Sequence, residues 1–179
     1  RGRYDTTHGT VETPVFMPVG TQGSVKSLTP EELETLGASI ILGNTYHLGL
    51  RPGIETLTAL GGMHTMYNWK GSILTDSGGF QVLSLAKFRK VSEEGVQFRS
   101  HHDGSLLNLT PEKAVEIQAA IGSDIMMCLD HLGPTDAPRL DVESAMARTT
   151  RWAQRCLDAR TRSDQALFAI IQGGTEFDL

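Results

Sequence analysis

The sequence lacks any long hydrophobic run, since no apolar stretch approaches the roughly 20 residues that a membrane-spanning helix needs. It also lacks, at its start, the charged and then apolar pattern of a secretory signal. These absences predict a soluble, cytoplasmic protein without a membrane partner. No low-complexity segment or linker divides the chain, so we expect residues 1–179 to form a single domain.

Cysteine is scarce, with Cys128 in an apolar run and Cys156 in a helical pattern. Their spacing matches no metal-binding motif, so we predict two reduced core thiols and no metal site within this chain. An excess of positive charge is absent too, because the chain has 16 basic and 21 acidic side chains and a net charge of −5. This balance argues against general adhesion to nucleic acid, although it leaves room for a local contact.

What the sequence does contain is a regular alternation of strand and helix patterns. Helices are predicted after the capping motifs at Thr29 and Thr110, near 54–60 and over 141–159. Strands are predicted at residues 14–19, 38–42, 71–75, 123–129 and 167–171, and a β-hairpin at 96–109.

Repeated βα units of this kind predict an α/β fold with a parallel sheet, either doubly wound or a (β/α)₈ barrel. The absence of a phosphate-binding glycine fingerprint favours the barrel. A complete barrel needs eight strands and about 250 residues. This chain is therefore expected to supply about the first five βα units of a TIM-type barrel, with an inserted β-hairpin.

Polar residues follow three of the predicted strands directly. Asp76 begins the segment DSGGFQ, Asp130 ends the second apolar run, and Gln172 precedes two glycines after the third. The carboxyl ends of neighbouring parallel strands share one edge, so these side chains should converge on a pocket. Taken alone, Asp76 would more often simply cap the following turn, and the residues by themselves leave both interpretations open.

Several segments together resemble one enzyme family. They are HGTVETPVFMPVGTQGSVK (8–26), LGNTYHLGLRPG (42–53), DSGGFQVLSL (76–85), the Leu129-Asp130 pair and FAIIQGG (168–174). In this order they are similar to tRNA-guanine transglycosylases, also called queuine tRNA-ribosyltransferases. The resemblance implies a (β/α)₈ barrel that exchanges the wobble guanine of tRNA for queuine or its precursor base during queuosine biosynthesis. It also implies a covalent enzyme–tRNA intermediate.

By this resemblance, Asp76 is the general acid/base that protonates the departing guanine and deprotonates the incoming base. Asp130 would accept the N1–H and 2-amino donors of guanine, while Gln172 or the N–H of Gly173 would donate to O6. Phe80 would offer a stacking face. The implied substrate-binding residues are Ser77, Gly78, Gly79, Phe80, Asp130, Gln172, Gly173 and Asn44. We further expect Asp130 to raise the pKa of Asp76 by its charge.

The resemblance covers only part of the family's machinery. The family's aspartate nucleophile and its zinc site of three cysteines and a histidine correspond to no residues here. Zinc is thus implied as a cofactor whose ligands are not in this chain, and we expect the chain alone to be inactive. The implied partners are tRNA and a free guanine- or queuine-type base, and the complete protein is expected to form a homodimer or heterodimer.

Two other functions remain compatible with the residues. One is a non-catalytic partner subunit of such an enzyme, which would have no chemical need for three convergent polar groups. The other is a barrel nucleosidase or glycosidase that uses Asp76 and Asp130 as its acid pair. That alternative explains the carboxylates but not the accompanying glutamine and glycines.

Overall fold

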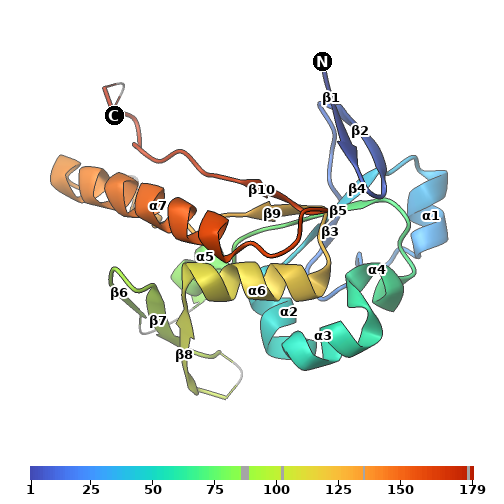
Figure 1. Cartoon of the computed structure of the whole chain (residues 1–179), viewed down its shortest axis with the longest axis horizontal. Coiled ribbons are helices and arrows are strands. Elements are labelled where there is room, and N and C mark those ends of the chain that lie inside the picture. Colours follow the sequence, from blue (N-terminus) through green and yellow to red (C-terminus); the bar gives the residue numbers. More distant parts are fainter. Residues whose placement is uncertain (86–88, 102, 135, 177) are drawn as a thin grey trace.

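The structure is a computed structural model that describes residues 1–85, 89–101, 103–134, 136–176 and 178–179. A five-stranded parallel sheet forms its centre, in the order β10-β9-β5-β4-β3 (Figure 1). The strands are β3 (Val19–Gly20), β4 (Ile40–Gly43), β5 (Ser72–Thr75), β9 (Ile125–Met127) and β10 (Ala166–Phe168). The predicted α/β fold with a parallel sheet is confirmed.

All five strands are shorter than predicted, and the differences at β3 and β10 have clear structural reasons. Only β3 remains of the strand expected at 14–19, because Pro14 and Pro18 have no N–H to donate to a sheet ladder. Strand β10 lies at the edge of the sheet and ends at Phe168 rather than at Ile171, whose side chain is 95% exposed. The segment that carries Gln172 therefore leaves the sheet earlier than the sequence pattern indicates.

Helices connect the parallel strands. They are α1 (Pro30–Thr35), α2 (Thr45–Leu48), α3 (Ile54–Leu60), α4 (Gly62–Tyr67), α5 (Gly79–Leu85), α6 (Pro111–Ile121) and α7 (Arg139–Ala159). The predicted N-caps are confirmed: the hydroxyl of Thr29 accepts from the N–H of Glu32, and the hydroxyl of Thr110 accepts from the N–H of Lys113. These caps satisfy N–H groups that the first helical turn leaves without partners. None of the helices in the described residues is both long enough and apolar enough to cross a membrane.

Two antiparallel elements accompany the parallel sheet. Strands β1 (Gly2–Thr6) and β2 (Gly9–Thr13) form a hairpin that was not predicted from the sequence. Its turn contains Gly9, whose φ of 122° is a conformation that favours glycine. The segment predicted as an inserted hairpin contains β7 (Val96–Arg99) and β8 (Leu106–Leu109), which pair antiparallel. They form a three-stranded sheet with β6 (Arg89–Val91).

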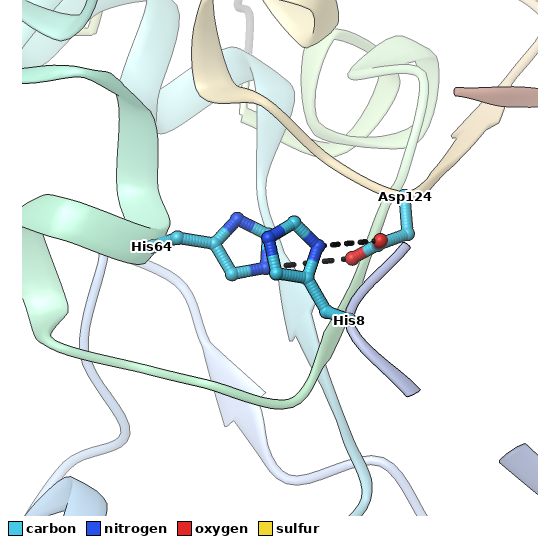
Figure 2. Close-up of side chains that lie close together, drawn as sticks. All are labelled: His8, His64 and Asp124. Atoms are coloured by element: carbon cyan, nitrogen blue, oxygen red, sulfur yellow. Dashed lines mark hydrogen bonds and ion pairs between the residues drawn. The ribbon is translucent and has the colours of Figure 1, made fainter. Parts of the chain in front are cut away.

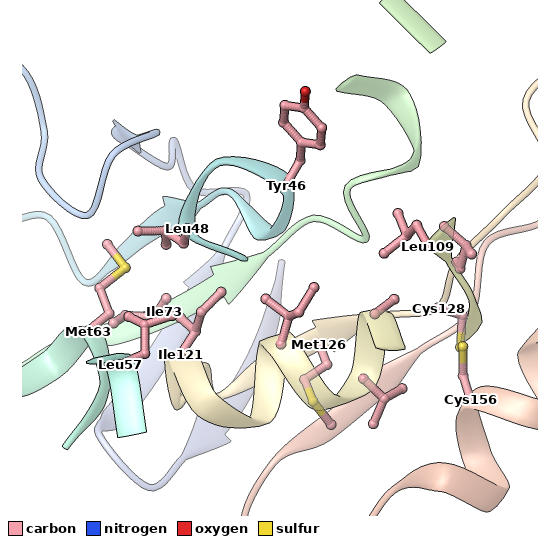
Figure 3. Packing of buried hydrophobic residues seen from close by; sticks show 14 of the residues in the cluster. Tyr46, Leu48, Leu57, Met63, Ile73, Leu109, Ile121, Met126, Cys128 and Cys156 are labelled. Atoms are coloured by element: carbon pink, nitrogen blue, oxygen red, sulfur yellow. The ribbon is translucent and has the colours of Figure 1, made fainter. Parts of the chain in front are cut away.

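The main hydrophobic core lies between one face of the parallel sheet and the helices (Figure 3). Side chains alternate across a strand, so Ile73 and Met126 enter this core while Ile40 and Ile125 point to the other face. There they pack with Val11 of the β1–β2 hairpin. The helical side of the core is fully buried and includes Leu57, Met63, Ile121, Trp152 and Cys156. Cys128 and Cys156 are buried free thiols, as predicted.

The side chain of Gln118, from α6, lies between strands β5 and β9. The register of β5 on β9 contains one residue pair, Leu74 with Ile125. Beyond that pair, the Gln118 amide accepts from the N–H of Met127 at 2.8 Å and donates to its carbonyl at 3.0 Å. The Gln118 carbonyl oxygen also accepts from the hydroxyl of Thr75 at 3.0 Å. A fully buried side chain thus takes the place of backbone pairing just before the two strands end.

Replacing Gln118 by leucine should destabilise the protein markedly. The substitution keeps the side chain's approximate size but leaves the N–H and C=O of Met127 without partners. We expect a loss of at least about 2 kcal/mol in the free energy of unfolding, because each unsatisfied buried group costs about 1–3 kcal/mol. Urea unfolding would measure it.

The matched control is Gln154→Leu, because Gln154 is exposed on α7 and bonds only the carboxylate of Asp158. Its effect should stay within about 0.5 kcal/mol, as is usual at the surface. Equal stabilities of the two variants would contradict the bridging role of Gln118.

Candidate active site

Asp76 follows β5 directly and is held by donors from the end of β4. The Asn44 amide donates to Oδ2 at 2.5 Å, and the backbone N–H groups of Thr45 and Gly78 donate to Oδ1 at 3.0 and 3.1 Å. The other end of the Asn44 amide accepts from the N–H of His47 as the N-cap of α2. This cap fixes which way the Asn44 amide faces, so its NH₂ group is directed at Asp76.

Burial raises the pKa of Asp76 from 3.8 to about 6, and the hydrogen bonds from Thr45 and Gly78 oppose this shift without cancelling it. The sequence analysis expected the raised pKa but attributed it to the charge of Asp130. The cause is instead desolvation, because the charged form of a carboxyl group is disfavoured away from water. A carboxyl group with this pKa can both give and take a proton near neutral pH.

Asp130 is the second acid of the site and has a separate set of partners. Gln172 donates from Nε2 to Oδ2 at 2.7 Å, and Ser77 donates from Oγ to Oδ1 at 3.4 Å. Asp130 is only 5% exposed, and burial raises its pKa while the hydrogen bonds from Gln172 and Ser77 lower it. Loops after three parallel strands thus bring Ser77, Asp130 and Gln172 together, at the edge where the sequence analysis placed them.

Two glycines let the turn after β5 lie close to its neighbours. Gly78 has a φ of 83°, and a Cβ there would lie 3.2 Å from the backbone nitrogen of Tyr46. A Cβ on Gly79 would lie 3.3 Å from Leu129 and 3.4 Å from the carbonyl oxygen of Asp130. Because neither position has room for a side chain, the turn can hold Asp76 against the end of β4 and Ser77 against Asp130.

The other residues singled out from the sequence lie around these two acids. Asn44 is buried and contacts Asp76, not Asp130. Phe80 lies in the first turn of α5 and is exposed, with 62% of its surface accessible. Gly173 is buried next to Gln172 and has a φ of 142°.

A cavity of about 550 Å³ adjoins the Asp130 side of the site. Gln172 and Gly173 line it, together with His131, Leu132 and Arg148. Its size suits a small organic ligand. Neither Asp76 nor Asp130 lines this cavity, so the two acids lie beside this space rather than in its wall.

Sequence analysis missed two polar residues in the cavity wall. Arg148, from α7, donates from Nη1 to Nδ1 of His131 at 2.9 Å. Burial, followed by the charge of Arg148, lowers the pKa of His131 and so favours the neutral imidazole. A helical arginine 17 residues away gives no local sequence signal of this contact. His131 could have been found because it directly follows Asp130.

This arrangement defines a class of protein. A parallel α/β sheet presents two buried carboxyl groups, two amide side chains and close backbone N–H donors at the carboxyl ends of its strands. Such a pocket is typical of α/β enzymes and ligand-binding proteins whose chemistry depends on proton transfer and on recognition of polar groups.

Comparison with known proteins narrows the class to one family. The family model described as queuine tRNA-ribosyltransferase matches residues 1–179. The chain is 60% identical to the queuine tRNA-ribosyltransferase of Pelotomaculum thermopropionicum and 56% identical to that of Thermus thermophilus, over 99% of this chain in both cases. A Staphylococcus aureus relative with the same name is 57% identical. The chain belongs to the queuine tRNA-ribosyltransferase family.

The matched region is only part of each relative. The chain spans about half the length of these curated proteins, covering 48% of the Pelotomaculum sequence, 47% of the Staphylococcus sequence and 46% of the Thermus sequence.

The raised pKa of Asp76 should make stability depend on pH in a defined direction. The folded-state pKa of about 6 exceeds the ordinary 3.8, so the folded protein binds more protons between these values. The stability linked to this group is present below pH 3.8 and is lost as the pH rises through about 6. The loss is at most about 3 kcal/mol, since one pKa unit corresponds to about 1.4 kcal/mol.

Asp76→Asn removes the titration, so the melting temperature of the wild type should fall relative to this variant between about pH 4 and about pH 8. An NMR titration of the Asp76 carboxyl should give a midpoint of about 6. Parallel stability curves and a midpoint of about 4 would show that the charged form is not desolvated.

Proposed function

We propose that this chain is the guanine-binding part of a tRNA-guanine transglycosylase with a (β/α)₈ barrel. The enzyme exchanges the wobble guanine of tRNA for queuine or its precursor base through a covalent enzyme–tRNA intermediate. One observation carries the proposal: Asp76 and Asp130, the two acids that the family resemblance assigns, occupy separate hydrogen-bonded positions at one edge of the parallel sheet. The partners are tRNA and the free base, and the complete protein acts as a dimer in the cytoplasm.

Asp130 is suited to reading the donor edge of guanine. Its two oxygens can accept the N1–H and the 2-amino group together, because an ionised carboxylate offers about four acceptor positions. The hydrogen bond from Gln172 at 2.7 Å and the contact with Ser77 use only part of this capacity. They also hold the carboxylate plane in place, which is a requirement for bidentate recognition.

Gln172 and Gly173 complete the recognition of the base. The amide of Gln172 or the N–H of Gly173 donates to O6, so the pocket selects guanine-type over adenine-type bases. Phe80, exposed on α5, provides the face on which the extracted base stacks. Ser77, Gly78 and Gly79 shape the turn that brings these groups close to the base.

Asp76 performs the proton transfers. A carboxyl group with a pKa of about 6 is protonated in a useful fraction of molecules near neutral pH and can give its proton to the departing guanine. The resulting carboxylate is stabilised by the Asn44 amide and by two backbone N–H groups. It can then take a proton from the incoming base.

The zinc implied by the family does not fit the residues of this chain. A set of three cysteines and one histidine cannot be assembled, because the chain has only two cysteines and both are buried in the core. No step of the proposed mechanism is therefore assigned to zinc.

The substitutions Asp130→Asn and Asp76→Asn should separate recognition from chemistry in the complete gene product. Asp130→Asn sets an amide donor against the donors of guanine and should raise the KM for guanine roughly 5- to 150-fold, the equivalent of about 1–3 kcal/mol. Asp76→Asn should leave guanine binding intact and lower kcat about 10²- to 10⁴-fold. Incorporation of labelled guanine into tRNA measures both. Asp158→Asn, an exposed change on α7, is the control.

Other outcomes of this assay would point elsewhere. Normal guanine binding by Asp130→Asn would remove Asp130 as the base reader. Absence of exchange in the folded, zinc-loaded complete protein would favour the non-catalytic partner subunit, and release of free base without exchange would favour a nucleosidase. Residues 1–179 alone should show no exchange.

A further inference from the structure

The opposite end of the parallel sheet holds a cluster of metal-ligating side chains that the proposed function does not use. Asp124 directly precedes β9, His8 lies in the turn between β1 and β2, and His64 lies in α4. These segments are far apart in the sequence, yet Figure 2 shows both imidazole rings directed at one carboxylate. The cluster is thus assembled by the fold and has no local sequence motif.

The donor atoms of this cluster are close enough to share one ion. Nδ1 of His8 lies 2.7 Å from Oδ1 of Asp124, and Nε2 of His64 lies 3.4 Å from Oδ2. One donor atom from each residue can be chosen so that all three lie within 4.8 Å of one another. The two rings stack with centroids 3.6 Å apart and an angle of 16° between their planes.

The carboxylate is fixed in place by further hydrogen bonds. The N–H of Ile73 donates to Oδ2 of Asp124 at 2.8 Å, and the hydroxyl of Thr7 donates to Oδ1 at 2.9 Å. Carboxylates that bind metal ions are generally held by such outer partners. The side chain of Asp124 is fully buried, whereas that of His8 is 37% exposed, so the cluster is anchored on one side and open on the other.

We propose that His8, His64 and Asp124 form a binding site for one divalent ion of the zinc type, with a fourth position open to water beside His8. Two imidazoles and a carboxylate are a donor set that zinc favours, and three protein ligands with one open position are a common zinc geometry. The ion would tie the β1–β2 hairpin to α4 and to the start of β9.

Binding requires the carboxylate and both imidazole rings to turn toward the ion. Ligands about 2.1 Å from a tetrahedral ion lie about 3.4 Å from each other. Nε2 of His64 lies at this distance from Oδ2 of Asp124, whereas Nδ1 of His8 lies 2.7 Å from the other oxygen, Oδ1. The carboxylate must therefore turn so that one oxygen faces both rings. The stacked rings tilt toward the ion, and Nε2 of His64 gives up its contact with the carbonyl oxygen of Gly71, 3.1 Å away.

This site differs from the family's zinc site, because it contains no cysteine. Metal content should be measured by mass spectrometry on the complete gene product, after zinc loading and removal of unbound metal. The wild type should hold one ion per chain more than His8→Gln or His64→Gln. Glutamine keeps an amide that can bond Asp124 but is a poor zinc ligand. His101→Gln, in the loop between β7 and β8, is the control and should match the wild type.

Cobalt substitution gives an independent result on the wild type alone. Thiolate-to-cobalt absorption reports the cysteine site, and a second set of visible bands without thiolate absorption should report the His8–His64–Asp124 site. Added zinc should also raise the melting temperature of the wild type more than that of His64→Gln. A wild type with only the thiolate-ligated ion would overturn the proposal and identify a hydrogen-bonded His–Asp–His group. That result would leave the exchange assay unaffected.

Discussion

The amide side chain of Gln118 is the interaction on which the active-site edge depends. In an ordinary parallel sheet the backbone of β5 would bond the N–H and C=O of Met127, but here the amide of Gln118 bonds both. Strands β5 and β9 are therefore not paired next to their carboxyl ends. The segment that begins at Asp76, after β5, and the segment that ends at Asp130, after β9, leave the sheet separately. A polar side chain in the core thus joins the two strands at the point where the segments that carry the two acids leave the sheet.

That separation gives the two carboxyl groups different chemistry. Both are buried, which raises both pKa values, but Asp76 is held by the Asn44 amide and backbone N–H groups while Asp130 is held by side chains. Backbone donors are rigidly placed, so they suit a group that changes charge during a reaction. Side-chain partners hold the Asp130 carboxylate from both oxygens, which suits the recognition role that we propose for it. One edge of a sheet therefore places two aspartates in different hydrogen-bonding environments, which fits the proposed division into an acid/base residue and a recognition residue.

Sequence patterns predicted those parts of the structure that short segments determine. The capping motifs located α1 and α6, and the apolar runs before Asp76 and Asp130 located β5 and β9, because these signals act within a few residues. The placement of Asp76, Asp130 and Gln172 after the carboxyl ends of the strands followed from the rule that parallel strands share an edge. The pairing of Asn44 with Asp76, the contact of Arg148 with His131 and the gathering of His8 and His64 around Asp124 were not predictable. Each joins residues from different elements, and nothing in the local sequence encodes the distance between them.

At the amino end of the sheet, as at the carboxyl end, a buried side chain bonds the backbone of a neighbouring strand. The carboxylate of Asp124, at the start of β9, accepts from the N–H of Ile73 in β5, so a side chain again joins the two strands. Between this bond and the amide of Gln118, the register of β5 on β9 contains only the pair of Leu74 with Ile125. Two buried side chains, Asp124 at the amino end and Gln118 at the carboxyl end, thus supplement the short backbone contact between these strands. His8 and His64 thus contact the carboxylate that joins the two strands from which Asp76 and Asp130 follow.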